Sequence, residues 1–158
     1  MNTTSSSMCR IFIDADACPV KKETINIATR NKIEVYIVSN GGIRPSTNPI
    51  VKTIVVDAGP DEADNWIVTN INKNDIVITA DILLSGRCIA KGGWVISHNG
   101  ESLTEDNIGR KTASRNLMFE IRSANPFHKG TGKEFIKSDR IHFTNKLEKI
   151  VQTIKKSL

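Results

Sequence analysis

Short runs of apolar, mostly β-branched residues alternate along this chain with segments whose apolar residues recur at helical spacing. Continuous apolar runs of this length indicate strands that are buried on both faces. The runs predict strands at residues 10–14, 32–39, 52–57, 75–79 and 94–97. The segments between and after them predict helices at about residues 20–31, from 61, at 82–91, at 105–122 and from about 138. This alternation predicts an α/β layer structure with a mostly parallel sheet.

Two of these predicted strands end on acidic residues. Asp14 and Asp16 follow the first strand, and Asp81 follows the strand at residues 75–79. Because the carboxyl ends of parallel strands meet at one edge of a sheet, where open α/β sheets bind ligands, we expect these carboxylates to lie close together. Clustered carboxylates repel one another and usually hold a hard cation, above all Mg²⁺.

A further acidic residue, Asp64, stands one turn into the helix that begins near residue 61. Asp61 is a suitable N-cap for that helix, and Asp64 occupies the position that Glu or Gln takes in a capping box. Asp is short for that reach, so capping explains Asp61 better than Asp64. We therefore include Asp64 among the predicted metal ligands.

Composition and charge narrow the class of protein. The chain has 158 residues, and we expect a polar, disordered tail at residues 1–8 and a single domain at residues 9–158. No apolar run is long enough to span a bilayer, and the three scattered cysteines form no CxxC pair, which favours a reduced, cytoplasmic protein. Residues 1–100 carry 10 Lys/Arg against 10 Asp/Glu, whereas residues 101–158 carry 12 against 7.

The basic excess in the last third, beside an acidic pocket, suits a polyanionic substrate, although a solubilising surface is the alternative reading. Basic residues fall in the first turn of the first helix, after its predicted strand, and along one face of the helix at residues 105–122; residues 123–137 read as a basic loop. The residues expected to contact a phosphate-containing substrate are Lys21, Lys22, Ser39, Asn40, Arg87, Lys111, Arg115 and Arg122.

Several motifs occur together: IFIDADACPVK, GPDEADNWIV, DIVITADILL, NGESLTEDNI and SRNLM. In this combination the chain resembles the bacterial YaiI/YqxD family over residues 9–158. The resemblance implies a PIN-like, three-layer α/β fold. In PIN-like nucleases, acids at strand ends bind Mg²⁺ or Mn²⁺ and RNA is cut by metal-activated water. Carried over by position, Asp14, Asp64 and Asp81 would be these acids, with Asp16 and Asp106 as weaker matches.

Three functional hypotheses remain at this point. The first is a metal-dependent phosphodiesterase that acts on RNA. The second is a small-molecule phosphatase similar to the HAD class, in which Asp14 is a covalent nucleophile and Asp16 its partner acid. The third is a non-catalytic RNA-binding module. The sequence does not determine the substrate or whether the chain forms oligomers.

Overall fold

The structure, a computed structural model, describes residues 9–15, 19–42, 44–59, 61–109 and 137–157. The strands are β1 (Ile11–Asp14), β2 (Val35–Ser39), β3 (Val51–Val55), β4 (Ile76–Ile78), β5 (Trp94–Ile96) and β6 (Ser102–Leu103). The helices are α1 (Lys21–Asn31), α2 (Glu62–Asn70), α3 (Ile82–Ala90) and α5 (Lys137–Ser157). Residues 105–109 are also helical. The predicted tail at residues 1–8 lies outside the described residues.

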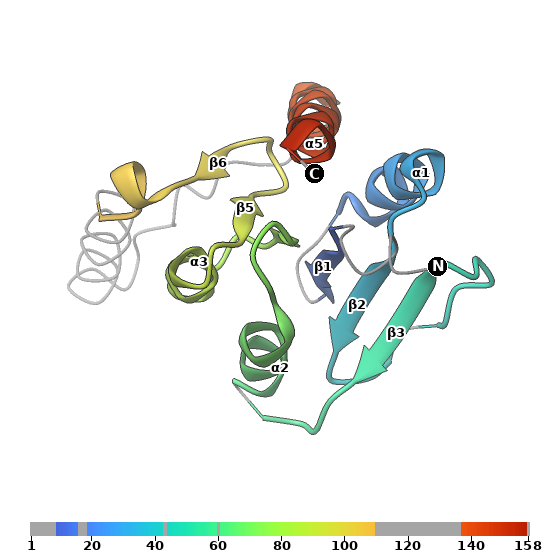
Figure 1. The fold of residues 1–158 in the computed structure, drawn as a ribbon. Coiled ribbons are helices and arrows are strands. Elements are labelled where there is room, and N and C mark those ends of the chain that lie inside the picture. Colours follow the sequence, from blue (N-terminus) through green and yellow to red (C-terminus); the bar gives the residue numbers. More distant parts are fainter. Residues whose placement is uncertain (1–8, 16–18, 43, 60, 110–136, 158) are drawn as a thin grey trace, which may run out of the picture.

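The strands form a single sheet in the order β3-β2-β1-β4-β5-β6 (Figure 1). Neighbours from β3 through β5 are parallel, and β6 pairs antiparallel with β5. In this register Ile13 of β1 lies between Ile37 of β2 and Ile78 of β4. The mostly parallel sheet confirms the predicted fold class. The sequence pattern missed β6, because two residues are too few to show a strand periodicity.

Helices cover both faces of the sheet (Figure 1), which gives the predicted three layers. Alternate residues of β1 pack against the helices on opposite faces of the sheet, since successive side chains of a strand point to opposite faces. Ile11 and Ile13 join the core beneath α1 and α5, together with Phe143 and Leu147 of α5. Phe12 joins the core beneath α2 and α3. All three β1 residues are fully buried, as the continuous apolar run predicts.

The predicted start of the second strand is wrong by three residues. The second strand begins at Val35 rather than at residue 32, because Lys32 adopts the left-handed conformation (φ 57°) that ends α1. The N–H of Ile33 then donates to the carbonyl of Ala28, as in a helix C-cap. In the last helix, which begins at Lys137, Asp139 lies within the first turn and is buried. A carboxylate at this position interacts favourably with the helix dipole.

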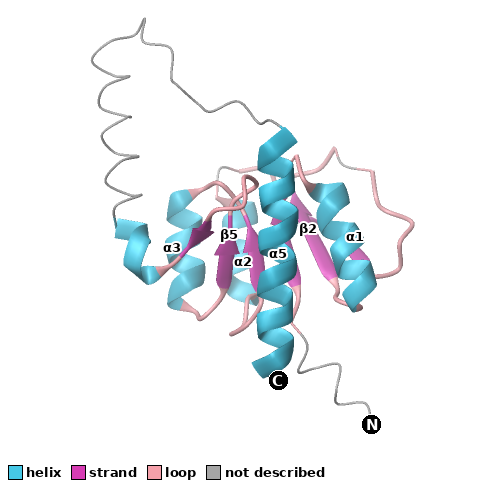
Figure 2. Cartoon of the chain, turned by 90° about the horizontal axis from the view of Figure 1, so that it is seen from above, coloured by secondary structure: helices cyan, strands magenta, loops and turns pink. Residues whose placement is uncertain are grey.

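Helix α5 lies across one face of the sheet beside α1 (Figure 2). Ion pairs join the two helices: Arg140 to Glu23 at 2.6 Å, and Arg30 to Glu148 at 3.0 Å. Arg140 also donates to the carbonyl of Pro19, just before α1. The amino end of α5 therefore lies at the sheet edge where β1 ends. No helix among the described residues has the length and apolar character needed to cross a lipid bilayer.

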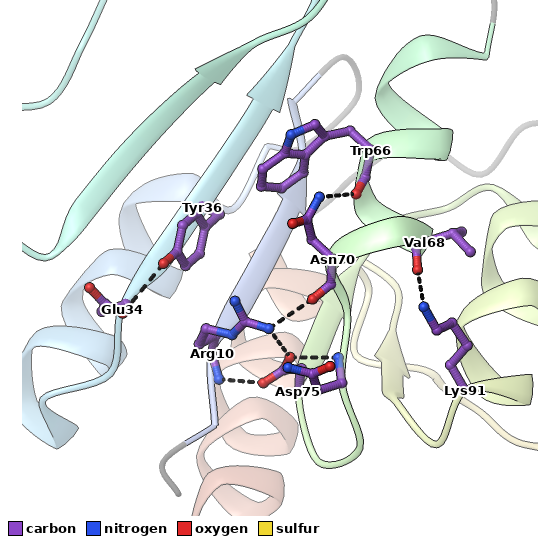
Figure 3. A network of polar contacts seen from close by, with 9 residues as sticks. Arg10, Glu34, Tyr36, Trp66, Val68, Asn70, Asp75 and Lys91 are labelled. Carbon is purple, nitrogen blue, oxygen red and sulfur yellow. Dashed lines mark hydrogen bonds and ion pairs between the residues drawn. The ribbon is translucent and has the colours of Figure 1, made fainter. Parts of the chain in front are cut away.

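A polar network stabilises the opposite edge of the sheet, where β1 and β4 begin (Figure 3). Asp75, whose side chain is 4% exposed, accepts hydrogen bonds from the backbone N–H and from Nη2 of Arg10, each at 2.9 Å. The same guanidinium donates to the carbonyl of Asn70 at 2.8 Å and lies 5.0 Å from the centre of the Phe12 ring. These contacts hold the amino ends of β1 and β4 in register. They thereby help to place the carboxyl ends of the two strands beside each other.

Candidate functional site

The candidate site lies at the carboxyl edge of the sheet, where β1 and β4 end side by side. Asp14 is the last residue of β1 and is partly buried. Thr79, which follows β4 and is 4% exposed, donates from Oγ1 to Oδ2 of Asp14 at 3.2 Å. The parallel pairing of β1 with β4 makes this contact direct, because Ile13 and Ile78 are opposite one another.

Asp81 follows Thr79 and caps α3. Its Oδ1 accepts hydrogen bonds from the backbone N–H groups of Leu83 and Leu84, at 2.9 and 3.1 Å. Its own backbone N–H donates to Oγ1 of Thr79 at 3.0 Å. The Thr79 hydroxyl therefore connects Asp14 to the segment that carries Asp81. One Asp81 oxygen is committed to the helix cap, which the sequence analysis did not anticipate.

Asp64 enters the same region from α2. Burial raises the pKa of Asp64 from 3.8 to about 6, and repulsion from Asp81, Asp14 and Asp61 adds to the effect, whereas Arg87 opposes it. Carboxylates from β1, α2 and the start of α3 thus lie near enough to repel one another. This repulsion favours either a proton or a cation in the site.

The predicted capping role of Asp61 is wrong. Asp61 precedes α2, yet its side chain makes no capping hydrogen bond. Its backbone angles (φ −119°, ψ 7°) lie outside the extended region that lets an N-cap side chain reach the first turn, whereas Asp81 (φ −80°, ψ 114°) is extended and does cap its helix. Asp61 instead contributes to the negative charge around Asp64.

The carboxylate side chains of this site are suitable metal ligands, but among the described residues their arrangement does not form a metal site. Carboxylate oxygens that repel one another are the ligands that Mg²⁺ and Mn²⁺ prefer. Within the part of the chain that the structure describes, however, no three His, Cys, Asp or Glu side chains are arranged to share one ion. Asp16, the fourth expected ligand, lies outside the described residues. Asp106 is exposed in the helical segment after Thr104.

Of the other residues expected to contact a substrate, those that the structure describes lie on α1, on α3 and at the end of β2. Lys21 and Lys22 lie in the first turn of α1, after β1, and Lys22 is exposed. Arg87 of α3 donates to Oδ1 of Asn65 at 3.0 Å, which holds its guanidinium beside α2 and near Asp64.

Ser39 is the last residue of β2 and Asn40 follows it, and both side chains have partners within the protein. The Ser39 hydroxyl accepts from the N–H of Gly41 and lies 3.0 Å from the Gly41 carbonyl, and Asn40 donates to the carbonyl of Asp57 at 2.8 Å. Both contacts shape the loops after β2 and β3. The expected residues of the basic helix, Lys111, Arg115 and Arg122, lie outside the described residues.

Thr79 is the residue of this site that the sequence analysis did not single out. It is buried, and its hydroxyl is hydrogen-bonded to the carboxylate of Asp14 and to the N–H of Asp81. Its signal in the sequence is a hydroxyl residue that ends an apolar strand two positions before an acid, as in Thr79-Ala80-Asp81. Such a residue is buried where its hydroxyl has partners, because an unpaired buried hydroxyl is costly.

Comparisons with known proteins agree with the resemblance seen in the motifs. A family model described as "Uncharacterized BCR, YaiI/YqxD family" matches residues 12–153. The chain is 51% identical over 145 residues to a UPF0178 protein of Roseobacter denitrificans, covering 92% of this chain and 96% of the relative. It is 47% identical to a UPF0178 protein of Ruegeria pomeroyi, covering 92% and 95%. No solved structure matches. The chain belongs to the YaiI/YqxD family.

Proposed function

We propose that this chain is a phosphodiesterase that acts on RNA with the help of Mg²⁺ or Mn²⁺. The observation that carries the proposal is the raised pKa of Asp64, to which burial and then repulsion from Asp81 and Asp14 contribute. It is supported by the position of Asp14 and Asp81 after neighbouring parallel strands. This edge is where open α/β sheets bind their ligands. A structural role accounts for one Asp81 oxygen and for the Asp14–Thr79 contact, but it leaves the unfavourable placement of Asp64 unexplained.

In this proposal Asp14, Asp64 and the outer oxygen of Asp81 would hold the ion, with Asp16 as a further ligand. A bound divalent cation supplies a Lewis acid for the phosphate and lowers the pKa of an attacking water. Thr79 orients the Asp14 carboxylate through its hydroxyl, and Arg87 balances part of the negative charge beside Asp64. Small movements of the side chains are required, because their present arrangement does not enclose an ion.

The phosphatase hypothesis uses the same edge but assigns the residues differently. There Asp14 attacks phosphorus and carries a covalent phosphoryl group, and Asp64 has no evident part. Asp64 therefore discriminates between the hypotheses, whereas Asp14 is needed by both. The RNA-binding module predicts no turnover at all.

The test compares wild type with Asp64→Asn on two substrates in the presence of Mn²⁺: a labelled single-stranded RNA and a generic phosphate monoester. Asp57→Asn is the matched control, because Asp57 is exposed and follows β3 at the same sheet edge, two strands away from β1. We expect RNA cleavage in wild type and in the control, and its loss in Asp64→Asn. Monoester turnover that survives in Asp64→Asn, with phosphate trapped on Asp14, would support the phosphatase instead. Inactivity of wild type on both substrates would refute the proposal.

A further inference from the structure

We propose that the basic face of α5 formed by His142, Asn145, Lys146 and Lys149 binds the phosphodiester backbone of a single RNA strand. These residues and Gly100 line a surface cavity between α5 and the loop that follows β5. The inference rests on the proposed function, because it supplies the surface that would hold the substrate of that reaction. It is separate from the acidic edge in its residues, and its test below is separate as well.

The cavity opens at the same sheet edge as the candidate site. β5 is the parallel neighbour of β4, and the N–H of Thr79 donates to the carbonyl of Ile96, the last residue of β5. The loop at residues 97–100 continues directly from that point, and its turn is closed by the N–H of Gly100 donating to the carbonyl of Ser97. The wall of the cavity is therefore one strand away from the segment that carries Thr79 and Asp81.

Gly100 shows that this loop is docked on α5. Its φ is +89°, and a Cβ at this position would lie 2.7 Å from the carbonyl carbon of His142 and 2.8 Å from the N of Phe143. No side chain fits between the loop and the helix backbone there. The cavity is consequently formed between two elements that are in direct contact.

The charges of α5 are distributed unequally around the helix. On the side that faces α1, Arg140 pairs with Glu23, and Glu148 pairs with Arg30. On the cavity side, within the described residues, neither Lys146 nor Lys149 forms an ion pair. The whole helix carries six Lys/Arg and two Asp/Glu. Among the described residues, the cavity side of α5 thus carries two lysines that form no ion pair.

The spacing of these residues suits an extended polyanion. His142, Asn145, Lys146 and Lys149 recur at three and four positions, so they form one row along the helix. Seven residues of helix span about 10 Å, which exceeds the size of a single phosphate group and matches two to three nucleotides at about 3.4 Å each. Lys ammonium groups on flexible stems adapt to such a backbone, and their apolar stems can contact sugars.

The segment at residues 110–136 is a poor candidate to cover this face. It carries six Lys/Arg and two Asp/Glu, so its net charge has the same sign as the cavity. An acidic polypeptide would also complement the charge of the helix. RNA is favoured because the row of basic residues lies beside the edge where the proposed phosphodiester chemistry takes place.

The experiment measures binding without turnover. A short fluorescein-labelled oligouridylate is titrated with the full chain in EDTA, at several KCl concentrations, and its fluorescence anisotropy is recorded. The test variant is Lys146→Gln with Lys149→Gln, and the control is Lys155→Gln with Lys156→Gln at the far end of the same helix. Both pairs remove two exposed or partly exposed positive charges, so overall charge is matched. Melting curves of both variants verify folding.

We expect the test variant to lose two phosphate contacts. The slope of log affinity against log salt should become shallower by about 1.4, and affinity at about 0.1 M salt should fall roughly 20-fold, with little change in the control. Equal losses in the two variants, or unchanged binding by the test variant, would overturn the inference. So would competition by polyglutamate as effective as that by unlabelled oligouridylate, since this would identify an acidic polypeptide as the fitting partner.

These outcomes are distinct from those of the proposed function. Binding that depends on Lys146 and Lys149 in a wild type that does not cleave RNA would remove the phosphodiesterase and leave the RNA surface. If wild type cleaves RNA but its RNA binding does not depend on these two lysines, the phosphodiesterase proposal would stand and the α5 binding surface would be refuted.

Discussion

Replacement of Asp64 by Asn should stabilise the metal-free protein at neutral pH. Burial and the neighbouring carboxylates raise the pKa of Asp64 to about 6, from an ordinary value of 3.8. The folded state therefore binds a proton more tightly than the unfolded state does. Ionisation of this group costs nothing below the unfolded pKa, costs progressively more as the pH rises from about 4 to 6, and reaches its full destabilising effect above the folded pKa. Asn carries no charge and removes this cost.

The size of the effect follows from the pKa difference and the exposure of the side chain. Each pKa unit corresponds to about 1.36 kcal/mol, so an unscreened shift to about 6 corresponds to roughly 3 kcal/mol. Asp64 is only partly buried, and solvent screens much of this interaction. We therefore expect Asp64→Asn to raise the free energy of unfolding by about 1 kcal/mol above pH 6, or the melting temperature by about 2–4 °C.

The assay is thermal unfolding in EDTA at a series of pH values, for wild type, Asp64→Asn and the exposed control Asp57→Asn. The difference between Asp64→Asn and wild type should be largest at about pH 7.5 and should vanish near pH 4, while Asp57→Asn follows wild type throughout. A destabilised Asp64→Asn at about pH 7.5, or a gain independent of pH, would refute the electrostatic account of this residue.

Three other substitutions test how the edges of the sheet are held. Gly100→Ala should cost about 3 kcal/mol in urea unfolding, because φ is +89° and the new Cβ would collide with the backbone of α5; a loss no larger than that of an ordinary surface change would contradict the docking of the loop. Thr79→Val should cost about 1–3 kcal/mol by leaving the Asp81 N–H without its acceptor, and Thr79→Ser should restore most of it in the same measurement. Asp75→Asn should cost about 2 kcal/mol, because the Arg10 guanidinium loses its charged partner, and added salt should narrow the gap to wild type only slightly, since Asp75 is buried. A melting temperature equal to that of wild type would count against this role of Asp75.

The layers and the location of the candidate site could be predicted because they follow from short-range patterns. β1 is apolar at three successive positions since both of its faces are buried, and this alone distinguishes it from a half-exposed strand. Once β1 and β4 are parallel neighbours, Asp14 and Asp81 must lie at the same edge. That conclusion needs no knowledge of side-chain contacts.

The hydrogen bonds within the site could not be predicted in this way. Whether an Asp before a helix caps it depends on its backbone angles, and two similar sequence positions, Asp61 and Asp81, differ in this respect. The burial of Asp139 and the bridge made by Thr79 depend on contacts between segments far apart in the chain. The pairing of Arg10 with Asp75, 65 residues away, is of the same kind.

The most direct test of the account is whether the acidic edge binds a divalent cation. Thermal unfolding of wild type and Asp14→Asn is measured in EDTA and with increasing MnCl₂, with Asp57→Asn as control. A cation that binds only the folded state stabilises it by mass action, by about 2.7 kcal/mol at 100 times the dissociation constant. We predict that Mn²⁺ raises the melting temperature of wild type and of Asp57→Asn, and leaves that of Asp14→Asn unchanged. A wild-type melting temperature that does not respond to Mn²⁺, or an equal response in Asp14→Asn, would contradict the proposed metal site.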